Sequence, residues 1–153
     1  MLWALPEPPP ASEGAVALWQ QFLPEGAPEG LYSLPQEVNH DRDRLRAAYL
    51  AWLHEVGQRP RRGRSLRDRM QIRPGLSYWW MTIPADFSLE PDSPAYRAVR
   101  LMAFAHLADR LEARTISVAT RDRSLARAVA EWARATDRQI TVIRPPSAEN
   151  APG

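Results

Sequence analysis

TISVATRDRSLARAVAEWARATDRQITVI, residues 115–143, is the stretch of sequence that decides the fold. Its two ends, residues 115–119 and 139–143, are short and rich in β-branched residues, which favours strands. Between them, apolar residues recur at helical spacing over about 122–136. A strand, a helix and a second strand joined by short loops are typical of two parallel strands with a crossover helix.

The same alternation continues toward the N-terminus. Residues 76–83 include the run Tyr78-Trp79-Trp80-Met81-Thr82-Ile83, which predicts a strand because it is aromatic and β-branched. A loop is expected over 84–91. Ser93-Pro94 then predicts the start of a helix that ends near residue 112, because Ser caps helices and Pro suits the first helical position. The order β-α-β-α-β over 76–143 predicts an α/β fold with a small parallel, Rossmann-like sheet.

Two further helices are expected before residue 76. An apolar stripe predicts a helix over 41–56, which Asn39 or Asp41 can cap and Gly57 can end. Ser65 and Asp68 have capping spacing and predict a short helix over 66–72. The buried side of this short helix would consist of Leu66, Met70 and Ile72.

The remaining segments suggest a division of the chain into three parts. Four prolines between residues 6 and 10 predict an irregular, Pro-rich segment over 1–30, with a helix of two turns at 15–23. Residues 31–144 are expected to form a single α/β domain. Residues 145–153 contain no core-forming residue and are expected to be a disordered tail.

The composition excludes several kinds of chemistry. All 20 basic residues are Arg, and the chain has neither Lys nor Cys. This rules out disulfides, Cys ligands and Cys nucleophiles, and also the P-loop and Schiff-base chemistry of lysine. Because Ala and Pro are abundant too, the missing lysines are explained by GC-rich codons better than by selection for Arg. No apolar run approaches the roughly 18 residues of a membrane span, and no secretory signal is visible, so we expect a cytoplasmic protein.

Seven arginines crowd into residues 59–73. Such a cluster can bind nucleic acid or anionic lipid, but a charge run is more often a solvated loop. The net charge of +2 and the lack of aromatic residues among these arginines make nucleic acid an unlikely partner.

The candidate binding site lies at the carboxyl ends of the predicted strands, where open parallel sheets bind ligands. The loop after residue 83 carries Asp86 and Ser88, and the loop at 120–122 places Arg121 and Asp122 at a helix N-terminus that can receive an anion. Alternatively, Arg121 and Asp122 contact no ligand and serve only as surface charge and helix cap. No Gly-rich phosphate loop and no metal-ligand spacing occur, so no cofactor and no metal are expected.

Trp79 and Trp80 are the most unusual local pair. On a strand their rings point to opposite faces of the sheet, so each can pack against a different helix layer. Alternatively, one ring faces the cleft and offers an apolar platform to a sugar or a nucleobase.

Several short runs of the sequence resemble a known protein family. The runs Leu45-Arg46-Ala47-Ala48-Tyr49-Leu50, Gly63-Arg64-Ser65-Leu66 and Leu76-Ser77-Tyr78-Trp79-Trp80-Met81-Thr82, with Gly57 between the first two, resemble bacterial surface carbohydrate biosynthesis proteins. That family is found with O-antigen, lipopolysaccharide and capsule genes and is regarded as glycosyltransferases. The resemblance covers roughly 31–143. It departs from the family at Asp86, where Glu is commoner, and locally at Pro84 and Phe87.

The resemblance implies an acceptor-side, glycosyltransferase-like domain that corresponds to the N-terminal domain of longer, two-domain members. If the domain transfers a glycosyl group, we expect Asp86 to be the catalytic base and Arg121 to stabilise phosphate charge, because both are predicted to lie at adjacent strand ends. Trp79, Trp80, Ser88 and Asp122 are the expected substrate-binding residues. A complete cleft needs a second α/β domain, which a separate chain could supply, so we expect this chain to be incomplete as a catalyst on its own. The implied location is the cytoplasm, peripheral to the inner membrane. The alternatives are a non-catalytic α/β module that pairs with a second protein and, more weakly, an Arg-rich nucleic-acid-binding module.

Overall fold

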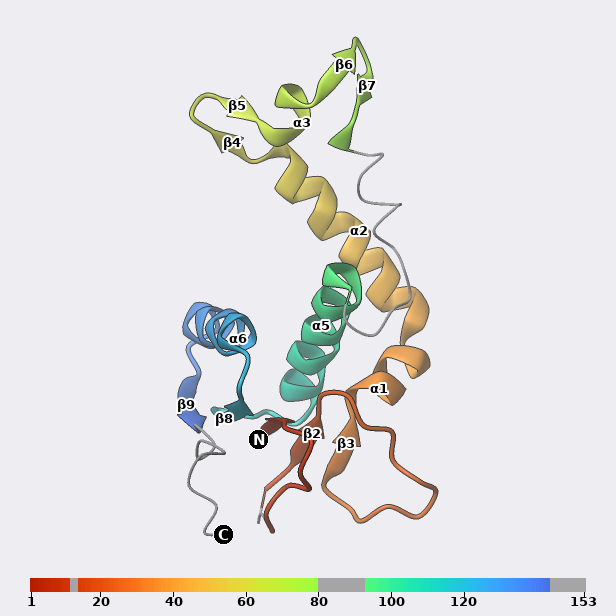
Figure 1. The fold of residues 1–153 in the computed structure, drawn as a ribbon, viewed down its shortest axis with the longest axis vertical. Coiled ribbons are helices and arrows are strands. Elements are labelled where there is room, and N and C mark those ends of the chain that lie inside the picture. The colour runs from red at the N-terminus through yellow and green to blue at the C-terminus, as the bar shows by residue number, and fades with distance from the viewer. Residues whose placement is uncertain (12–13, 80–92, 144–153) are drawn as a thin grey trace, which may run out of the picture. The chain divides into compact units, whose positions relative to one another are not determined.

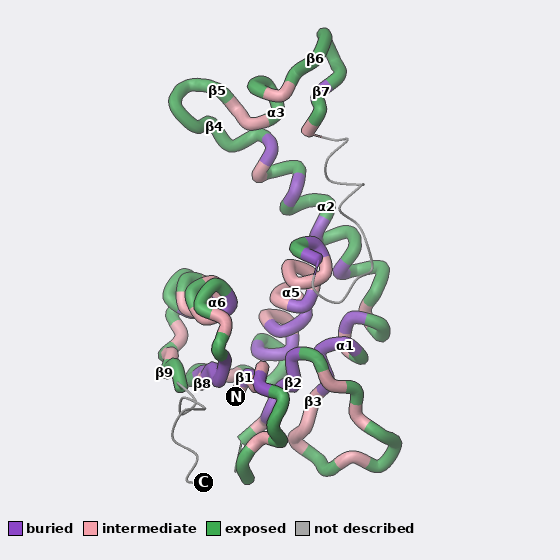
Figure 2. The backbone as a smooth tube through the Cα atoms, viewed as in Figure 1, coloured by how far each residue is buried: buried purple, intermediate pink, exposed green. Residues whose placement is uncertain are grey.

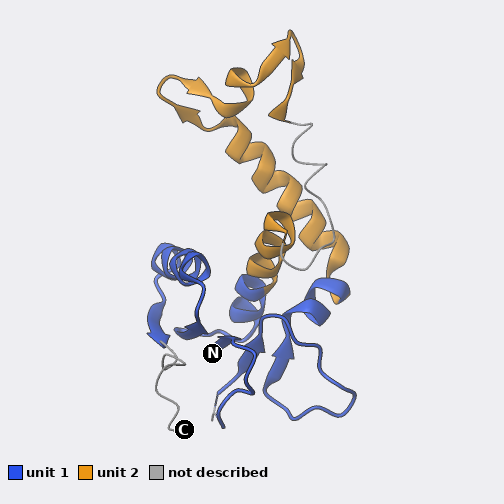
Figure 3. Cartoon of the chain, in the orientation of Figure 1, with its two compact units in different colours: residues 1–39, 104–153 blue, residues 40–103 orange. Residues whose placement is uncertain are grey.

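The computed structural model describes residues 1–11, 14–79 and 93–143. The chain divides into two compact units (Figures 1 and 3). Unit 1 combines residues 1–39 with residues 104–153, and unit 2 consists of residues 40–103. Helix α5 (Pro94–Arg110) passes from unit 2 into unit 1 at Phe104.

Unit 1 contains a five-stranded sheet in which every neighbouring pair is parallel. The strand order β3-β2-β1-β8-β9 is that of a small Rossmann-like α/β fold, as the sequence predicts (Figure 1). The strands are β1 (Leu2–Ala4), β2 (Val16–Leu18), β3 (Leu31–Ser33), β8 (Thr115–Thr120) and β9 (Gln139–Ile143).

The prediction that residues 1–30 are irregular is wrong, because this segment supplies two strands of the sheet, and the helix expected at 15–23 is replaced by β2. Leu2 and all three residues of β2 are buried (Figure 2). A strand buried on both faces is a short apolar run without alternation, so its sequence shows no strand periodicity. The prolines follow β1 instead of interrupting it, so they remove no hydrogen bond from the sheet.

In the described part of unit 1, three helices belong wholly or partly to the unit. They are α1 (Leu34–His40), the second half of α5, and α6 (Arg123–Ala135), which connects β8 to β9. The rings of Phe104 on α5 and Trp132 on α6 meet edge to face, with centroids 5.5 Å apart. Helix α6 buries Leu125, Val129 and Ala133, as the predicted periodicity requires. The predictions for α5, β8, α6 and β9 are therefore confirmed.

Unit 2 is built around α2 (Arg42–Gln58) and the first half of α5. Between them, residues 59–77 form two small antiparallel hairpins and one short helix. The first hairpin pairs β4 (Pro60–Arg61) with β5 (Arg64–Ser65), and the second pairs β6 (Gln71–Arg73) with β7 (Leu76–Ser77). The short helix between the hairpins is α3 (Leu66–Arg69).

Helix α2 is confirmed, but its ends differ from the prediction. Asp41 occupies the N-cap position without a side-chain capping bond and instead pairs with Arg44. Gly57 is buried inside the last turn and is not the residue that ends the helix. The buried stripe is Leu45, Tyr49 and Leu53, at intervals of one turn, and Ala95 of α5 lies in the same cluster as the last two.

Residues 65–79 correct the predicted β-α-β-α-β order. Ser65 does cap a helix, since its hydroxyl accepts the Asp68 N–H at 3.1 Å, but α3 ends at Arg69 and Ile72 is exposed instead of buried. Among the described strands, β7 pairs with β6 in a separate two-stranded sheet and not with the parallel sheet. Tyr78 lies in a turn and Trp79 is helical, so the aromatic run does not begin a strand as predicted.

The remaining part of that predicted strand, the loop after it and the predicted tail lie outside the described residues. The start of α5 is as predicted, with the Ser93 hydroxyl accepting the Tyr96 N–H at 3.1 Å and Pro94 in the first turn.

Candidate functional site

The order of the strands creates a switch point between β1 and β8. From β1 the chain adds β2 and then β3 on one side, and later adds β8 and β9 on the other side. In open parallel sheets, ligands bind outside the carboxyl ends of the two strands at which the order reverses. Here those ends are adjacent, because Ala4 of β1 lies in register with Thr120 of β8.

An ion pair joins the two loops that leave this switch point. A guanidinium nitrogen of Arg121, the residue after β8, lies 3.0 Å from a carboxylate oxygen of Glu7, which follows β1 by three positions. Both side chains are about half exposed, at 54% each. The Trp3 indole N–H donates to the Glu7 carbonyl at 2.7 Å and holds the backbone of that loop. Cation and carboxylate therefore stand together at the edge of the sheet where a ligand would enter.

The loop between β8 and α6 is held by its own side chains. The Thr120 hydroxyl accepts the Asp122 N–H at 3.0 Å. One oxygen of the Asp122 carboxylate accepts the N–H groups of Ser124 and Leu125, at 2.8 and 3.2 Å, and so caps α6. Two of the amide groups that an anion could have used are thus already satisfied by Asp122. The Arg121 guanidinium uses one nitrogen for Glu7 and keeps further N–H donors that an anion can use.

Trp79 lies in unit 2, whereas Arg121 and Asp122 lie in unit 1. The Trp79 ring packs against Gly57 on α2 and against the cluster that includes Tyr49, Leu53 and Ala95. A Cβ on residue 57 would lie 3.0 Å from both Cδ1 and Cε2 of the ring and closer still to Nε1. The indole is therefore a packing group of unit 2. Trp80, Asp86 and Ser88, the other three predicted site residues, lie outside the described residues.

Two hollows in the described parts of the chain contain none of the predicted site residues. One, of about 240 Å³, lies in unit 1 and is lined by Met1, Ala15, Tyr32, Phe104 and Thr115 among others. Met1, Ala15 and Thr115 precede or begin strands, so this hollow is at the amino ends of the sheet, opposite the switch point. The other, of about 210 Å³, lies in unit 2 between α3 and the β6–β7 hairpin.

The sequence pattern predicts Arg121 and Asp122 as site residues but gives no indication of Glu7. These residues are far apart in the chain, and Glu7 falls in the segment predicted to be irregular. The one signal was the apolar run Met1-Leu2-Trp3-Ala4-Leu5, which is compatible with a buried parallel strand whose carboxyl end precedes Glu7.

Neither a metal centre nor a membrane span is found in the part of the chain that the structure describes. Residues 1–11, 14–79 and 93–143 contain no cluster of His, Asp and Glu that could hold a metal ion. None of the helices described combines the length and the apolar character needed to cross a membrane. In comparisons with known proteins, no family model, no curated protein and no solved structure matches the chain.

Proposed function

We propose that the chain is a glycosyltransferase-like domain of surface polysaccharide biosynthesis that binds a phosphorylated sugar at the carboxyl ends of β1 and β8. The single observation that carries the proposal is the Glu7–Arg121 pair across the switch point of the sheet. The resemblance of residues 31–143 to surface carbohydrate biosynthesis proteins supplies the reaction class.

The chemistry of the pair matches such a ligand in two ways. A guanidinium presents several N–H donors in one plane and recognises phosphate oxygens with paired hydrogen bonds. A carboxylate accepts hydrogen bonds from hydroxyl groups, which a sugar offers in number. A sugar phosphate or a nucleotide sugar carries both kinds of group, so it can use Arg121 and Glu7 together.

The ion pair is also weak enough to be opened by a ligand. Both partners are half exposed, and such surface pairs contribute only about 0–1 kcal/mol to stability. Exchanging the Glu7 carboxylate for a doubly charged phosphate therefore costs little. The Glu7 side chain remains beside the ligand because its backbone is held by the Trp3 indole.

In glycosyl transfer, an acceptor hydroxyl oxygen forms a bond to the anomeric carbon while the bond from that carbon to the phosphate oxygen breaks. The electron pair leaves with the phosphate, where Arg121 would stabilise the developing negative charge. A base takes the proton of the attacking hydroxyl. The residue predicted for that role, Asp86, lies outside the described residues, so the present proposal concerns binding and charge stabilisation.

The test compares ligand binding by the natural chain and by Arg121→Gln. The ligands are a panel of nucleotide sugars, together with sugar 1-phosphates and inorganic phosphate, and affinity is measured by calorimetry. Because a charged hydrogen bond contributes about 1.5–3 kcal/mol, Arg121→Gln should weaken binding of the preferred ligand at least about tenfold.

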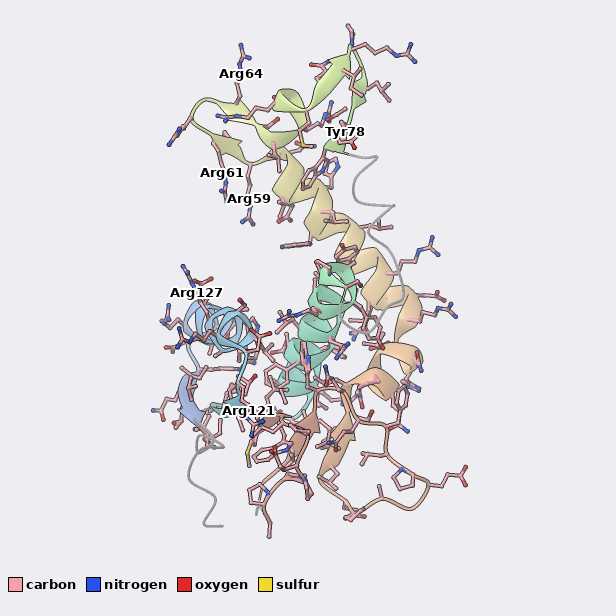
Figure 4. The ribbon with its side chains drawn as sticks, viewed as in Figure 1. Arg59, Arg61, Arg64, Tyr78, Arg121 and Arg127 are labelled. Atoms are coloured by element: carbon pink, nitrogen blue, oxygen red, sulfur yellow. The ribbon has the colours of Figure 1, made fainter. Side chains whose placement is uncertain are left out.

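Arg127→Gln is the matched control, because Arg127 lies on α6, the helix that follows Arg121 (Figure 4), and is also exposed and paired with a carboxylate, Glu131, at 2.9 Å. It should leave the affinity unchanged. Equal loss in both variants would mean that only the net charge matters, and no binding of any phosphorylated sugar by the natural chain would reject the proposed function. Glu7→Gln should bind inorganic phosphate more tightly, since it removes the competing carboxylate, and should lose part of the preference for the sugar.

A further inference from the structure

The segment of unit 2 from Arg59 to Tyr78, here called the arm, concentrates the positive charge of the chain. It holds seven Arg against one Asp, a net charge of +6, whereas the whole chain has a net charge of only +2. The arm comprises both hairpins and α3. Charge that is segregated in this way creates a local field strong enough to attract an anionic surface.

The first hairpin presents its arginines to solvent. Its two turn residues, Arg62 and Gly63, both have positive φ, 52° and 78°, as a tight two-residue hairpin turn requires. Arg61, Arg62 and Arg64 are therefore displayed around the tip, and Figure 4 shows Arg61 and Arg64 extending away from the ribbon. Within the described residues, none of these three side chains forms an ion pair, so their charge is not neutralised locally.

The second hairpin presents apolar side chains next to this charge. Its turn is Pro74-Gly75, with Gly75 at φ 79°, and Arg73 and Leu76 face each other across it. Ile72 is 60% exposed, Tyr78 is 49% exposed and Leu76 is 36% exposed. Large apolar groups that stay in water are commonly part of a contact surface when they gather in one place.

The arm buries almost nothing of its own. Helix α3 has no buried residue, and between Arg59 and Tyr78 only Ser77 is buried (Figure 2). Its local ties are polar, such as the Ser77 hydroxyl that donates to the Arg67 carbonyl at 2.7 Å and the Arg69 guanidinium that donates to the Arg61 carbonyl. The exposed groups of the arm are therefore available to a partner without unfolding a core.

We propose that the arm binds the surface of an anionic lipid membrane, with the arginines at the phosphate headgroups and Ile72 and Leu76 inserted among them. Basic side chains gain from the negative potential of anionic lipid, and apolar side chains gain from the boundary between headgroups and acyl chains. Nucleic acid would interact with the charge but not with the exposed aliphatic residues. The aromatic side chains on which bases usually stack are represented in the arm by Tyr78 alone. The combination of both features at neighbouring hairpins is what favours lipid.

The experiment is flotation of the full chain with vesicles, either of phosphatidylcholine alone or of phosphatidylcholine and phosphatidylglycerol in equal parts. Binding is expected only to the anionic vesicles and should weaken as salt is raised. The triple variant Arg61→Gln, Arg62→Gln, Arg64→Gln should bind about a hundredfold more weakly, at roughly fivefold for each lost cation. Ile72→Ser should bind about tenfold more weakly without any change in charge.

A matched triple variant controls for net charge. Arg114→Gln, Arg123→Gln and Arg134→Gln remove the same charge from exposed positions of unit 1 and should leave vesicle binding unchanged. All substituted side chains are exposed, so circular dichroism should show every variant folded. Equal loss in the two triple variants, an unaffected Ile72→Ser, or no binding to anionic vesicles would each overturn the proposal. Retention on nucleic acid that depends on the arm, with no vesicle binding, would assign the arm to the other class of partner.

Discussion

Replacing Gly57 by Ala should destabilise the protein, although the same change in an ordinary helix would stabilise it. Gly costs about 1 kcal/mol relative to Ala inside a helix, so propensity alone predicts a gain of that size. The structure predicts the opposite sign, because the new Cβ would lie 3.0 Å from two carbons of the Trp79 ring and closer still to Nε1. The ring is wide and held by the α2 and α5 cluster, so it cannot turn aside as a flexible side chain would.

The magnitude follows from these two opposing terms. Forcing an extra methyl group into a packed contact costs about 1–3 kcal/mol, which exceeds the propensity gain, so we expect a net loss of about 1 kcal/mol in the free energy of unfolding. In a Trp79→Ala background the clash is absent, and Gly57→Ala should then raise the free energy of unfolding by up to about 1 kcal/mol. The reversal of sign between the two backgrounds is specific to contact between residues 57 and 79.

The assay is urea denaturation followed by circular dichroism, with the four proteins of the double-mutant cycle. Ala51→Gly calibrates the propensity term, since Ala51 is exposed on the same helix, and it should cost up to about 1 kcal/mol. A stabilising Gly57→Ala in the natural background would refute the packing of Trp79 against α2. The alternative suggested by the sequence, in which the indole ring offers a platform to a sugar, would then be favoured.

Three further predictions concern unit 1. Leu2→Ala should lower the free energy of unfolding, measured by urea denaturation, by about 2–5 kcal/mol, because Leu2 is fully buried in β1. Phe22→Ala, at an exposed position, should change it by less than about 0.5 kcal/mol, and equal effects of the two variants would contradict the N-terminal strand. Asp122→Ala should lower the free energy of unfolding by about 1 kcal/mol, because α6 loses its N-cap, and Asp122→Asn should lower it much less, because Asn can also cap. Identical losses in the two variants would mean that the charge of Asp122 matters more than its capping bonds. Burial lowers the pKa of the Met1 amino group below 8.0, so the folded state binds this proton less tightly than the unfolded state does. The free energy of unfolding should therefore rise with pH up to about 8.0. An N-acetylated chain should lack this rise.

The C-terminal half of the sheet was predictable because its elements are long enough to show their periodicity. Strand β8, helix α6 and strand β9 each have several residues of one pattern, and Ser93-Pro94 marks the start of α5. Strands β1, β2 and β3 have three residues each, too few for any pattern to stand out from the surrounding prolines and glycines. They are recognisable only once β8 provides the neighbour against which β1 pairs.

The errors in unit 2 have a different cause. The residues Tyr78 and Trp79 have high strand propensity, but propensity for strands reflects fit to a pleated surface, and no sheet neighbour is present for them among the described residues. Gly is the residue type that commonly ends helices, but Gly57 lies inside α2, and its lack of a side chain leaves room for the Trp79 ring. In the first case the lack of a sheet neighbour in the described part of the chain, and in the second a tertiary contact, decides the local structure.

The candidate site was predictable in part for the same reason. Arg121 and Asp122 follow directly from the rule that ligands bind at the carboxyl ends of parallel strands. Glu7 does not, because its place beside Arg121 depends on the pairing of β1 with β8, which joins opposite ends of the sequence. The capping role of Asp122 shifts the expected anion contact from the helix amides to the Arg121 side chain.

Backbone amide NMR during titration with the preferred phosphorylated sugar tests the central claim most directly. We expect the shifts to gather at the carboxyl ends of β1 and β8, at Leu5 and Glu7 and from Thr120 to Ser124, and Arg121→Gln to abolish them at the same ligand concentration. Shifts confined to the arm or to the hollow at the amino ends of the strands, or shifts that persist in Arg121→Gln, would contradict a ligand site at the switch point of the sheet.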